Sequence, residues 1–100
     1  MTTDLRRSQR YALSLPVEAV VGAHQDSFQA VSENISGNGI YFVSPQPLAA
    51  DERILFIVTL AQNTFRPART RIHCRGRVVR VDPRGASFGI AAMIDQYYFE

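Results

Sequence analysis

Residues Asn34 to Gly39 bring together, within a few positions, the groups that a flat polar ligand needs. Asn34 and Ser36 lie two positions apart, so on a strand they share one face while Ile35 points to the other. Gly39 leaves the neighbouring backbone uncovered by a side chain. An amide, a hydroxyl and a glycine in this spacing predict a small hydrogen-bonding platform that itself carries no charge.

Positive charge is concentrated instead near the N-terminus, where Arg6, Arg7 and Arg10 follow one another. A guanidinium group is planar and donates pairs of parallel hydrogen bonds, which suits guanine edges and phosphates. Apart from Met1, the only sizeable apolar side chain in residues 1–9 is Leu5. We therefore expect residues 1–10 to form a flexible Arg-rich arm that a ligand or a partner can order.

The composition sets the class of protein. With 100 residues, 46% apolar residues and 20% charged residues, the chain is long enough for one small globular domain with one core. Its net charge is only +2, and all of its basic residues other than histidine are Arg. So small an excess of positive charge does not predict a nucleic-acid surface, and we expect neither DNA nor RNA as a partner.

The sequence also lacks the usual signals for metals, export and membranes. Cys74 is the only cysteine, so neither an intrachain disulfide nor a thiolate metal cluster is expected. His24 and His73 have no ligand partners at metal spacing, and no metal site is predicted. Residues 1–10 do not resemble a signal peptide, and no apolar run reaches the ~20 residues of a membrane span. These features favour the cytoplasm.

The elements that must position the platform and the arm are strands. Hydrophobic alternation predicts six of them, at residues 11–21, 28–34, 40–43, 54–60, 69–81 and 87–94. Pro16 suggests a bend or an edge position in the first strand. The alternation slips at Val78 and Val79, which predicts a β-bulge. Polar connections are expected at 22–26 and 62–67, and Asp82 to Gly85 has the composition of a turn.

Six short strands with regular turn signals predict an all-β fold, namely a six-stranded antiparallel β-barrel formed by residues 11–100. A barrel is favoured over a sandwich because so small a sheet would otherwise leave its edges exposed. Asp95 could cap a helix, so the fold would carry at most a short C-terminal helical stub.

Two motifs in this order resemble the PilZ domain, a bacterial receptor module for cyclic di-GMP. Arg6-Arg7-Ser8-Gln9-Arg10 contains R-x-x-x-R just before the first strand, and Asn34 to Gly39 fits [D/N]-x-S-x-x-G at a strand turn. The resemblance continues through residues 45–48, 75–81 and 88–90, so it covers nearly the whole chain.

The resemblance implies a barrel whose N-terminal arm folds over cyclic di-GMP. Arg6 and Arg10 would contact guanine edges or phosphates, and Arg7 would add a phosphate contact. Asn34 would accept a hydrogen bond from a guanine N–H, Ser36 would bond the ligand beside it, and Gly39 would allow close approach. No cofactor is implied beyond this ligand. The signal would pass to a downstream protein partner of unknown identity, with the domain acting as a monomer or a weak dimer.

The sequence departs from the family pattern in two ways. Asn34 replaces the more frequent Asp, which gives up a charge-assisted hydrogen bond. The family commonly has a C-terminal helix over one mouth of the barrel, whereas this sequence reaches Glu100 where such a helix would begin. Tyr97, Tyr98 and Phe99 would then form a short plug or a patch that awaits a partner.

Other readings remain open for the same residues. Asn38-Gly39 is a hairpin signal that needs no ligand, and the three N-terminal arginines alone could be a solvated tail. Their joint occurrence favours the ligand site, because a hairpin requires no arginines upstream. The alternatives are a barrel of the same fold that binds proteins but no nucleotide and, less favoured, a small nucleic-acid-binding barrel. Ser36 has no histidine near it in any motif, so an enzyme is not expected.

Overall fold

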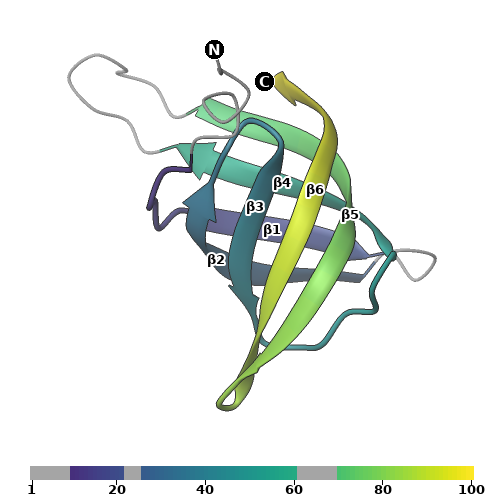
Figure 1. Cartoon of the computed structure of the whole chain (residues 1–100). Helices are drawn as coiled ribbons and strands as arrows, with labels where there is room; N and C mark the ends of the chain where they lie inside the picture. Colours follow the sequence, from purple (N-terminus) through teal and green to yellow (C-terminus); the bar gives the residue numbers. More distant parts are fainter. Residues whose placement is uncertain (1–9, 22–25, 61–69) are drawn as a thin grey trace, which may run out of the picture.

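The chain is a closed barrel in the computed structural model, which describes residues 10–21, 26–60 and 70–100 (Figure 1). Its strands, in order along the chain, are β1 (Pro16–Val21), β2 (Asp26–Ile35), β3 (Gly39–Ser44), β4 (Arg53–Leu60), β5 (Thr70–Arg84) and β6 (Ser87–Phe99). His24, Arg69, the predicted connection at 62–67 and residues 22–25 of the connection predicted at 22–26 lie outside the described residues. Asp26, the last residue of that predicted connection, belongs to β2 instead.

The strands close in the order β1-β2-β3-β6-β5-β4, and every neighbouring pair is antiparallel. The predicted six-stranded antiparallel β-barrel is therefore confirmed. β5 and β6 are the longest strands and form one long hairpin that curves around the barrel (Figure 1).

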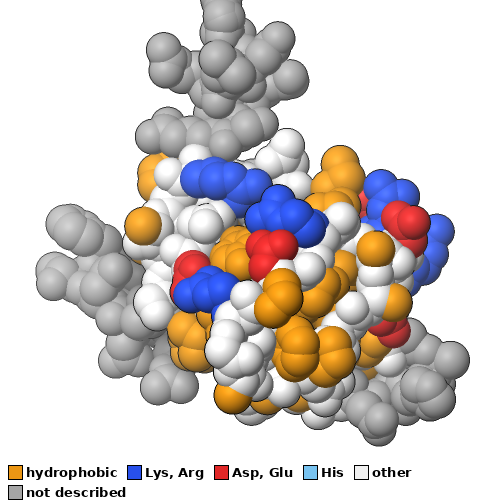
Figure 2. Space-filling view, turned by 60° about the horizontal axis from the view of Figure 1, so that its bottom comes forward, with side chains coloured by type: hydrophobic (Ala, Val, Ile, Leu, Met, Phe, Trp, Pro, Cys, Tyr) orange, Lys and Arg blue, Asp and Glu red, His pale blue; other side chains and the backbone are white. Residues whose placement is uncertain are grey.

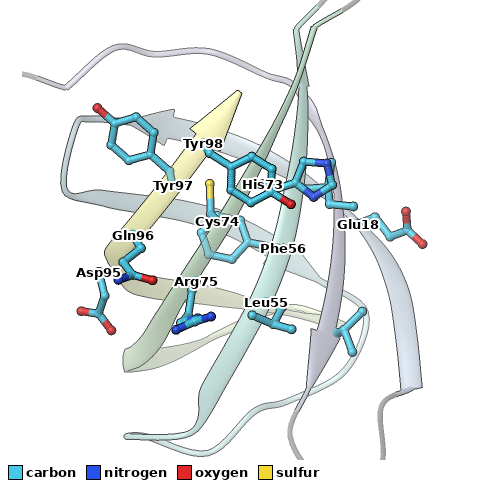
Figure 3. A pocket seen from close by; sticks show the side chains of 12 residues that line it. Glu18, Leu55, Phe56, His73, Cys74, Arg75, Asp95, Gln96, Tyr97 and Tyr98 are labelled. Atoms are coloured by element: carbon cyan, nitrogen blue, oxygen red, sulfur yellow. The ribbon is translucent and has the colours of Figure 1, made fainter. Parts of the chain in front are cut away.

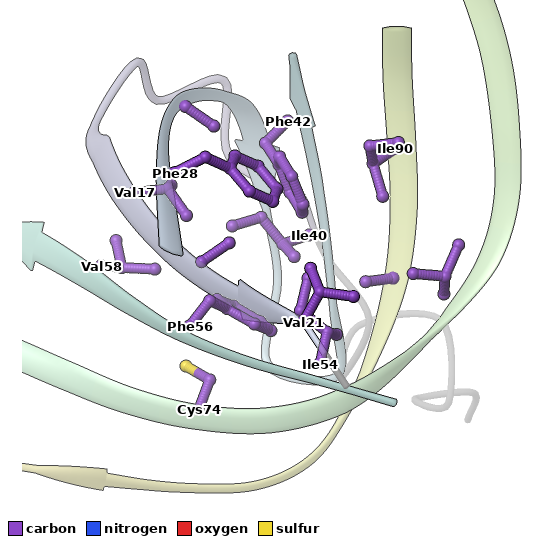
Figure 4. Close-up of a cluster of buried hydrophobic side chains, with 14 residues drawn as sticks. Val17, Val21, Phe28, Ile40, Phe42, Ile54, Phe56, Val58, Cys74 and Ile90 are labelled. Carbon is purple, nitrogen blue, oxygen red and sulfur yellow. The ribbon is translucent and has the colours of Figure 1, made fainter. Parts of the chain in front are cut away.

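The core fills the barrel because alternate residues of each strand point inward. Phe42 and Phe56 lie at its centre, with ring centroids 6.3 Å apart, and both are almost fully buried (Figure 4). Around them pack the aliphatic residues that the alternation predicted, including Val17, Ile40, Ile54, Val58, Val78 and Ile90. Cys74 is buried as well, and its burial raises the pKa of the thiol to about 11 because a thiolate is poorly solvated there.

The first predicted strand was drawn too long. Residues 11–15 are not part of β1, and Tyr11 makes only an isolated bridge to Ile35. The physical reason is the buried hydroxyl of Ser32, which donates to the carbonyl of Leu13 at 2.6 Å and accepts from the amide of Leu15 at 2.9 Å. The Ser32 amide still donates to the carbonyl of Leu15 at 2.9 Å, but beyond this bond the Ser32 side chain replaces the backbone ladder.

Two further expectations need correction at the ends of β5 and β6. The turn predicted at 82–85 lies later, at Gly85 and Ala86, because β5 continues to Arg84, which pairs with Ser87. Gly85 takes a φ of 61°, and a tight two-residue hairpin favours glycine at such a position. Asp95 caps no helix, since β6 runs on to Phe99 and pairs with β5 from Ile72 to Arg75.

Three bulges interrupt the ladders. The predicted slip near Val78 is confirmed, with Val79 as the extra residue between Val78–Ala92 and Arg80–Ala91. A second bulge leaves Asp95 unmatched on β6, and a third leaves Glu33 unmatched on β2. The bulge at Glu33 stands directly before Asn34, the first residue of the predicted platform.

Candidate binding site

A tight connection between β2 and β3 carries the first half of the predicted site. Ile35 pairs with Ile40, and the amide of Ser36 donates to the carbonyl of Gly39 at 2.8 Å, which closes the turn. The Ser36 hydroxyl lies 2.9 Å from Oδ1 of Asn38 and 3.4 Å from the carbonyl oxygen of Gly39. Only 8% of Ser36 is exposed. Its hydroxyl therefore holds the turn, and it would have to rotate to bond a ligand.

The second half of the site is Arg10, which reaches the same turn from the N-terminal side. Its Nη1 donates to Oδ1 of Asn34 at 2.6 Å. Its Nη2 lies 3.6 Å from the point that a Cβ on Gly39 would occupy. The guanidinium group thus extends from the Asn34 amide to the bare backbone of Gly39.

Main-chain contacts fix the approach of Arg10. The next residue, Tyr11, exchanges two backbone hydrogen bonds with Ile35, of 2.8 and 3.0 Å. Since Ile35 lies between Asn34 and Ser36, this bridge brings the start of the described chain against the end of β2. The structure therefore unites Arg10, Asn34, Ser36 and Gly39. Arg6 and Arg7 lie outside the described residues, so their predicted contacts remain predictions.

The model of the PilZ domain matches residues 4–98 of this sequence, which is nearly the whole chain. The chain belongs to the PilZ domain family. Members of this family are binding and effector modules, and cyclic di-GMP is the ligand with which the family is associated.

Structural comparison supports the fold of this PilZ domain. Its barrel is similar to the inhibitor of motility (MotI/DgrA) of Bacillus subtilis, with a TM-score of 0.74 and 20% sequence identity. The match covers 93% of this chain but only 44% of that protein. No curated protein matches the sequence.

Arg10 has no ion-pair partner among the described residues, unlike three other arginines of this PilZ domain. Among the described residues no carboxylate pairs with Arg10, whose partner Asn34 is neutral. Arg71, Arg80 and Arg84, in contrast, each form an ion pair with a carboxylate. Figure 2 shows such basic and acidic side chains lying side by side on one face of the barrel. Arg10 therefore presents positive charge that the described protein does not neutralise.

Sequence reasoning missed a second polar group beside the site, on β2, β3 and β5. Arg84 binds both carboxylate oxygens of Glu33, at 3.1 and 2.9 Å, and this contact lowers the pKa of Glu33 and raises that of Arg84. Tyr41, the strand partner of Asn34, donates to Asp82 at 3.2 Å. The Glu33 contact spans 51 positions, so no local motif could reveal it.

A separate surface hollow of about 750 Å³ lies away from these residues, beside the last part of β6 (Figure 3). Its lining includes Leu55, His73, Cys74 and Tyr98, and it contains none of the predicted site residues. The described part of the chain holds no group of three or more potential metal ligands. It also holds no helix that is long and apolar enough to cross a membrane.

Proposed function

We propose that this PilZ domain is a receptor for cyclic di-GMP, which binds over Arg10, Asn34 and Gly39. The observation that carries the proposal is the Arg10 guanidinium, held by a neutral amide at 2.6 Å above a glycine backbone. The ligand is a dianion with two guanines. A cation without a carboxylate partner supplies charge for its phosphates, and the unused N–H groups suit the O6 and N7 atoms of guanine.

Each residue has a distinct role in this proposal. Arg10 binds the ligand directly, and Asn34 orients Arg10 or accepts from a guanine N–H once the arginine turns to the ligand. Ser36 preserves the turn that presents Asn34 and Gly39. Arg6 and Arg7 add contacts when residues 1–10 close over the ligand. The closed arm changes the surface beside the β2–β3 turn, and a downstream partner protein reads that change.

A calorimetric titration of the domain with cyclic di-GMP tests this function. We expect saturable binding by the parent chain and a loss of about 10- to 100-fold in affinity for Arg10→Ala, because a charge-assisted hydrogen bond is removed. Arg84→Ala is the matched control, since it removes an exposed guanidinium already bound to Glu33, and its affinity should stay within about twofold of the parent.

Other results would favour the rival functions. No binding by the parent chain at high micromolar ligand would leave a protein-binding barrel without a nucleotide ligand. Equal binding of GMP or of random RNA, with affinity that falls steeply with salt, would favour a nucleic-acid-binding barrel.

Hydrogen exchange tests the closing arm separately. Amides of residues 2–10 should be protected when cyclic di-GMP is present and should exchange faster without it. Residues of β4, which lies away from the site in the sheet order, serve as the internal control and should exchange equally in both states. Unchanged exchange of residues 2–10 in a complex that forms by calorimetry would rule out the arm mechanism while preserving the ligand site.

A further inference from the structure

The last part of β6 has one strand neighbour where the rest of β6 has two. β3 pairs with β6 only as far as Gly39–Met93, and the last contact on that side is the Ile94 amide to the Asn38 carbonyl at 2.9 Å. β5 accompanies the other side of β6 to Phe99. Within 10–21, 26–60 and 70–100, no strand pairs with the outer side of residues 95–99. We call residues 95–99 the free edge.

The direction of the backbone groups along the free edge follows from one hydrogen bond. The Glu100 amide donates to the carbonyl of Arg71, on β5, at 2.8 Å. In an antiparallel ladder the direction alternates with each residue, so the amides of Tyr98 and Gln96 also face β5. Tyr97 and Phe99 must then direct their N–H and C=O groups outward. These outward groups can pair with another strand.

The side chains of the free edge are aromatic and open to solvent. Tyr97, Tyr98 and Phe99 are 54%, 62% and 58% exposed. On one face Tyr97 and Phe99 meet edge to face, with ring centroids 6.2 Å apart. On the other face Tyr98 stacks on His73 at 4.8 Å (Figure 3). Natural edge strands are usually blunted by lysine, proline, an inward charge or a bulge. In the free edge only Asp95 is charged and bulged, and residues 96–99 contain none of these devices.

We propose that the free edge pairs antiparallel with the free edge of a second copy of this chain, giving a two-fold symmetric dimer. The register places Tyr97 opposite Phe99 of the second copy, so that the outward groups of both residues bond across the interface. Tyr98 then faces Tyr98 of the second copy at the symmetry axis. This proposal depends on the geometry of β6 and not on ligand binding.

We favour this register because the side chains that it places opposite one another are compatible. Gln96 faces Glu100 of the second copy, and an amide can donate to that carboxylate. Tyr97 and Phe99 form cross-strand aromatic pairs on one face, which stabilise antiparallel strands. Asp95, the bulged residue, faces none of residues 96–100. No like charges face each other, and each strand presents the same pattern to its copy, as a two-fold interface requires.

The structure also disfavours the neighbouring register. If Tyr97 faced Tyr97 of the second copy, Phe99 would face Asp95, and Glu100 would face Ile94. The Ile94 amide is already bound to Asn38, so the β2–β3 turn occupies that place. In the proposed register residues 96–100 pair among themselves, so none of them faces Ile94 or the turn.

Disulfide trapping tests the register directly. Tyr98 and its copy form a non-hydrogen-bonded pair, whose Cα atoms lie about 4.5 Å apart and fall within disulfide range. Tyr98→Cys in a Cys74→Ala background should therefore form a covalent dimer under mild oxidation. Gln96→Cys in the same background is the control, because the two copies of residue 96 lie four positions apart along the ladder. Equal trapping of both variants, or of neither, would overturn the proposed register.

Sedimentation velocity over a concentration series tests whether the edge itself associates. The parent chain should shift from monomer to dimer as concentration rises. Tyr97→Pro removes an outward N–H that β5 does not use, so it should remain monomeric at concentrations where the parent is dimeric. Tyr97→Ala keeps that N–H and should retain dimerisation in part.

A charge pair at Gln96 provides a test that does not alter the backbone. Gln96→Glu places two like charges opposite each other twice per dimer and should weaken association by roughly 2- to 30-fold, whereas Gln96→Lys should strengthen it. A parent chain that stays monomeric throughout, or a dimer that is indifferent to Tyr97→Pro and to both charge variants, would overturn the proposal. A monomer that instead binds an extended peptide of another protein along β6 would also overturn it.

Discussion

Two adjacent residues of β2, Glu33 and Asn34, hold two arginines in opposite electrostatic states. Glu33 neutralises Arg84 with two carboxylate contacts, whereas Asn34 holds Arg10 through one amide oxygen and leaves its charge intact. The bulge at Glu33 separates the two positions in the ladder. An arginine that is held in place and has no carboxylate partner can bind an anion directly. An arginine that is bound to a carboxylate would first have to give up that partner. The proposed function therefore gives ligand binding to Arg10 and not to Arg84.

The largest expected effect concerns the segment that brings Arg10 to β2. Ser32→Ala removes the hydroxyl that bonds Leu13 and Leu15, leaving two backbone groups without it. We expect a loss of about 1–3 kcal/mol in the free energy of unfolding, measured by urea denaturation. The affinity for cyclic di-GMP should fall as well, because the chain that carries Arg10 loosens.

Ser44→Ala is the matched control for this prediction. Ser44 is equally buried, and its hydroxyl likewise bonds two backbone groups, both of Gln46, but it lies at the other end of β3. The Ser44→Ala variant should lose a similar free energy of unfolding, with no change in its affinity for cyclic di-GMP. If Ser32→Ala left the affinity unchanged, the anchoring of residues 11–15 would not contribute to the ligand site.

The next prediction compares substitutions of the two neighbouring residues, Asn34 and Glu33. Asn34→Ala should lower the affinity for cyclic di-GMP by about tenfold, because it removes a hydrogen bond that positions Arg10. Glu33→Ala should leave the affinity within about twofold, since it releases a guanidinium outside the site. Calorimetry on both variants measures the difference, and a larger loss for Glu33→Ala would reverse the assignment of Arg10 and Arg84.

The sequence predicted the barrel because its alternation reflects which residues face the core. Phe56 and Ile90 are inward on the expected strands, and the bulge at Val79 appears as a break in the pattern. The alternation gave the wrong boundary for the first strand, because a residue far along the sequence determines the structure there. Leu13 and Leu15 alternate as in a strand, but the Ser32 hydroxyl bonds that segment.

The helix expected after Asp95 does not form, because pairing of β6 with β5 outweighs the local capping signal. The cap signal of Asp95 is local, whereas the aromatic residues after it favour a strand and find β5 beside them. Of the site, the motif spacing placed Asn34, Ser36 and Gly39 at one strand turn and the family resemblance brought Arg10 to them, and the structure has these four residues together. The role of Glu33 could not be predicted, because Arg84 follows it by 51 positions.

The smallest effect is a difference in pH dependence between the Arg84–Glu33 contact and the Arg10–Asn34 contact. The hydrogen bond from Arg84 lowers the pKa of Glu33 below its usual value of 4.5. A carboxyl group whose pKa is lower in the folded state stabilises the fold above its unfolded pKa, and this contribution disappears as the pH falls through the lowered value. The melting temperature of the parent should therefore decrease more on acidification than that of Glu33→Gln.

Glu100 gives both proteins a shared acid dependence, because its contact with His73 lowers its pKa too, so only the difference between the two melting curves reports Glu33. That difference should be present near neutral pH and vanish in acid. The Arg10–Asn34 contact joins a guanidinium to a neutral amide and contains no carboxyl group, so the difference in melting temperature between the parent and Asn34→Ala should stay constant with pH. Superimposable curves for the parent and Glu33→Gln would show that Arg84 is no better compensated than Arg10, and the contrast between the neighbours would lose its electrostatic basis.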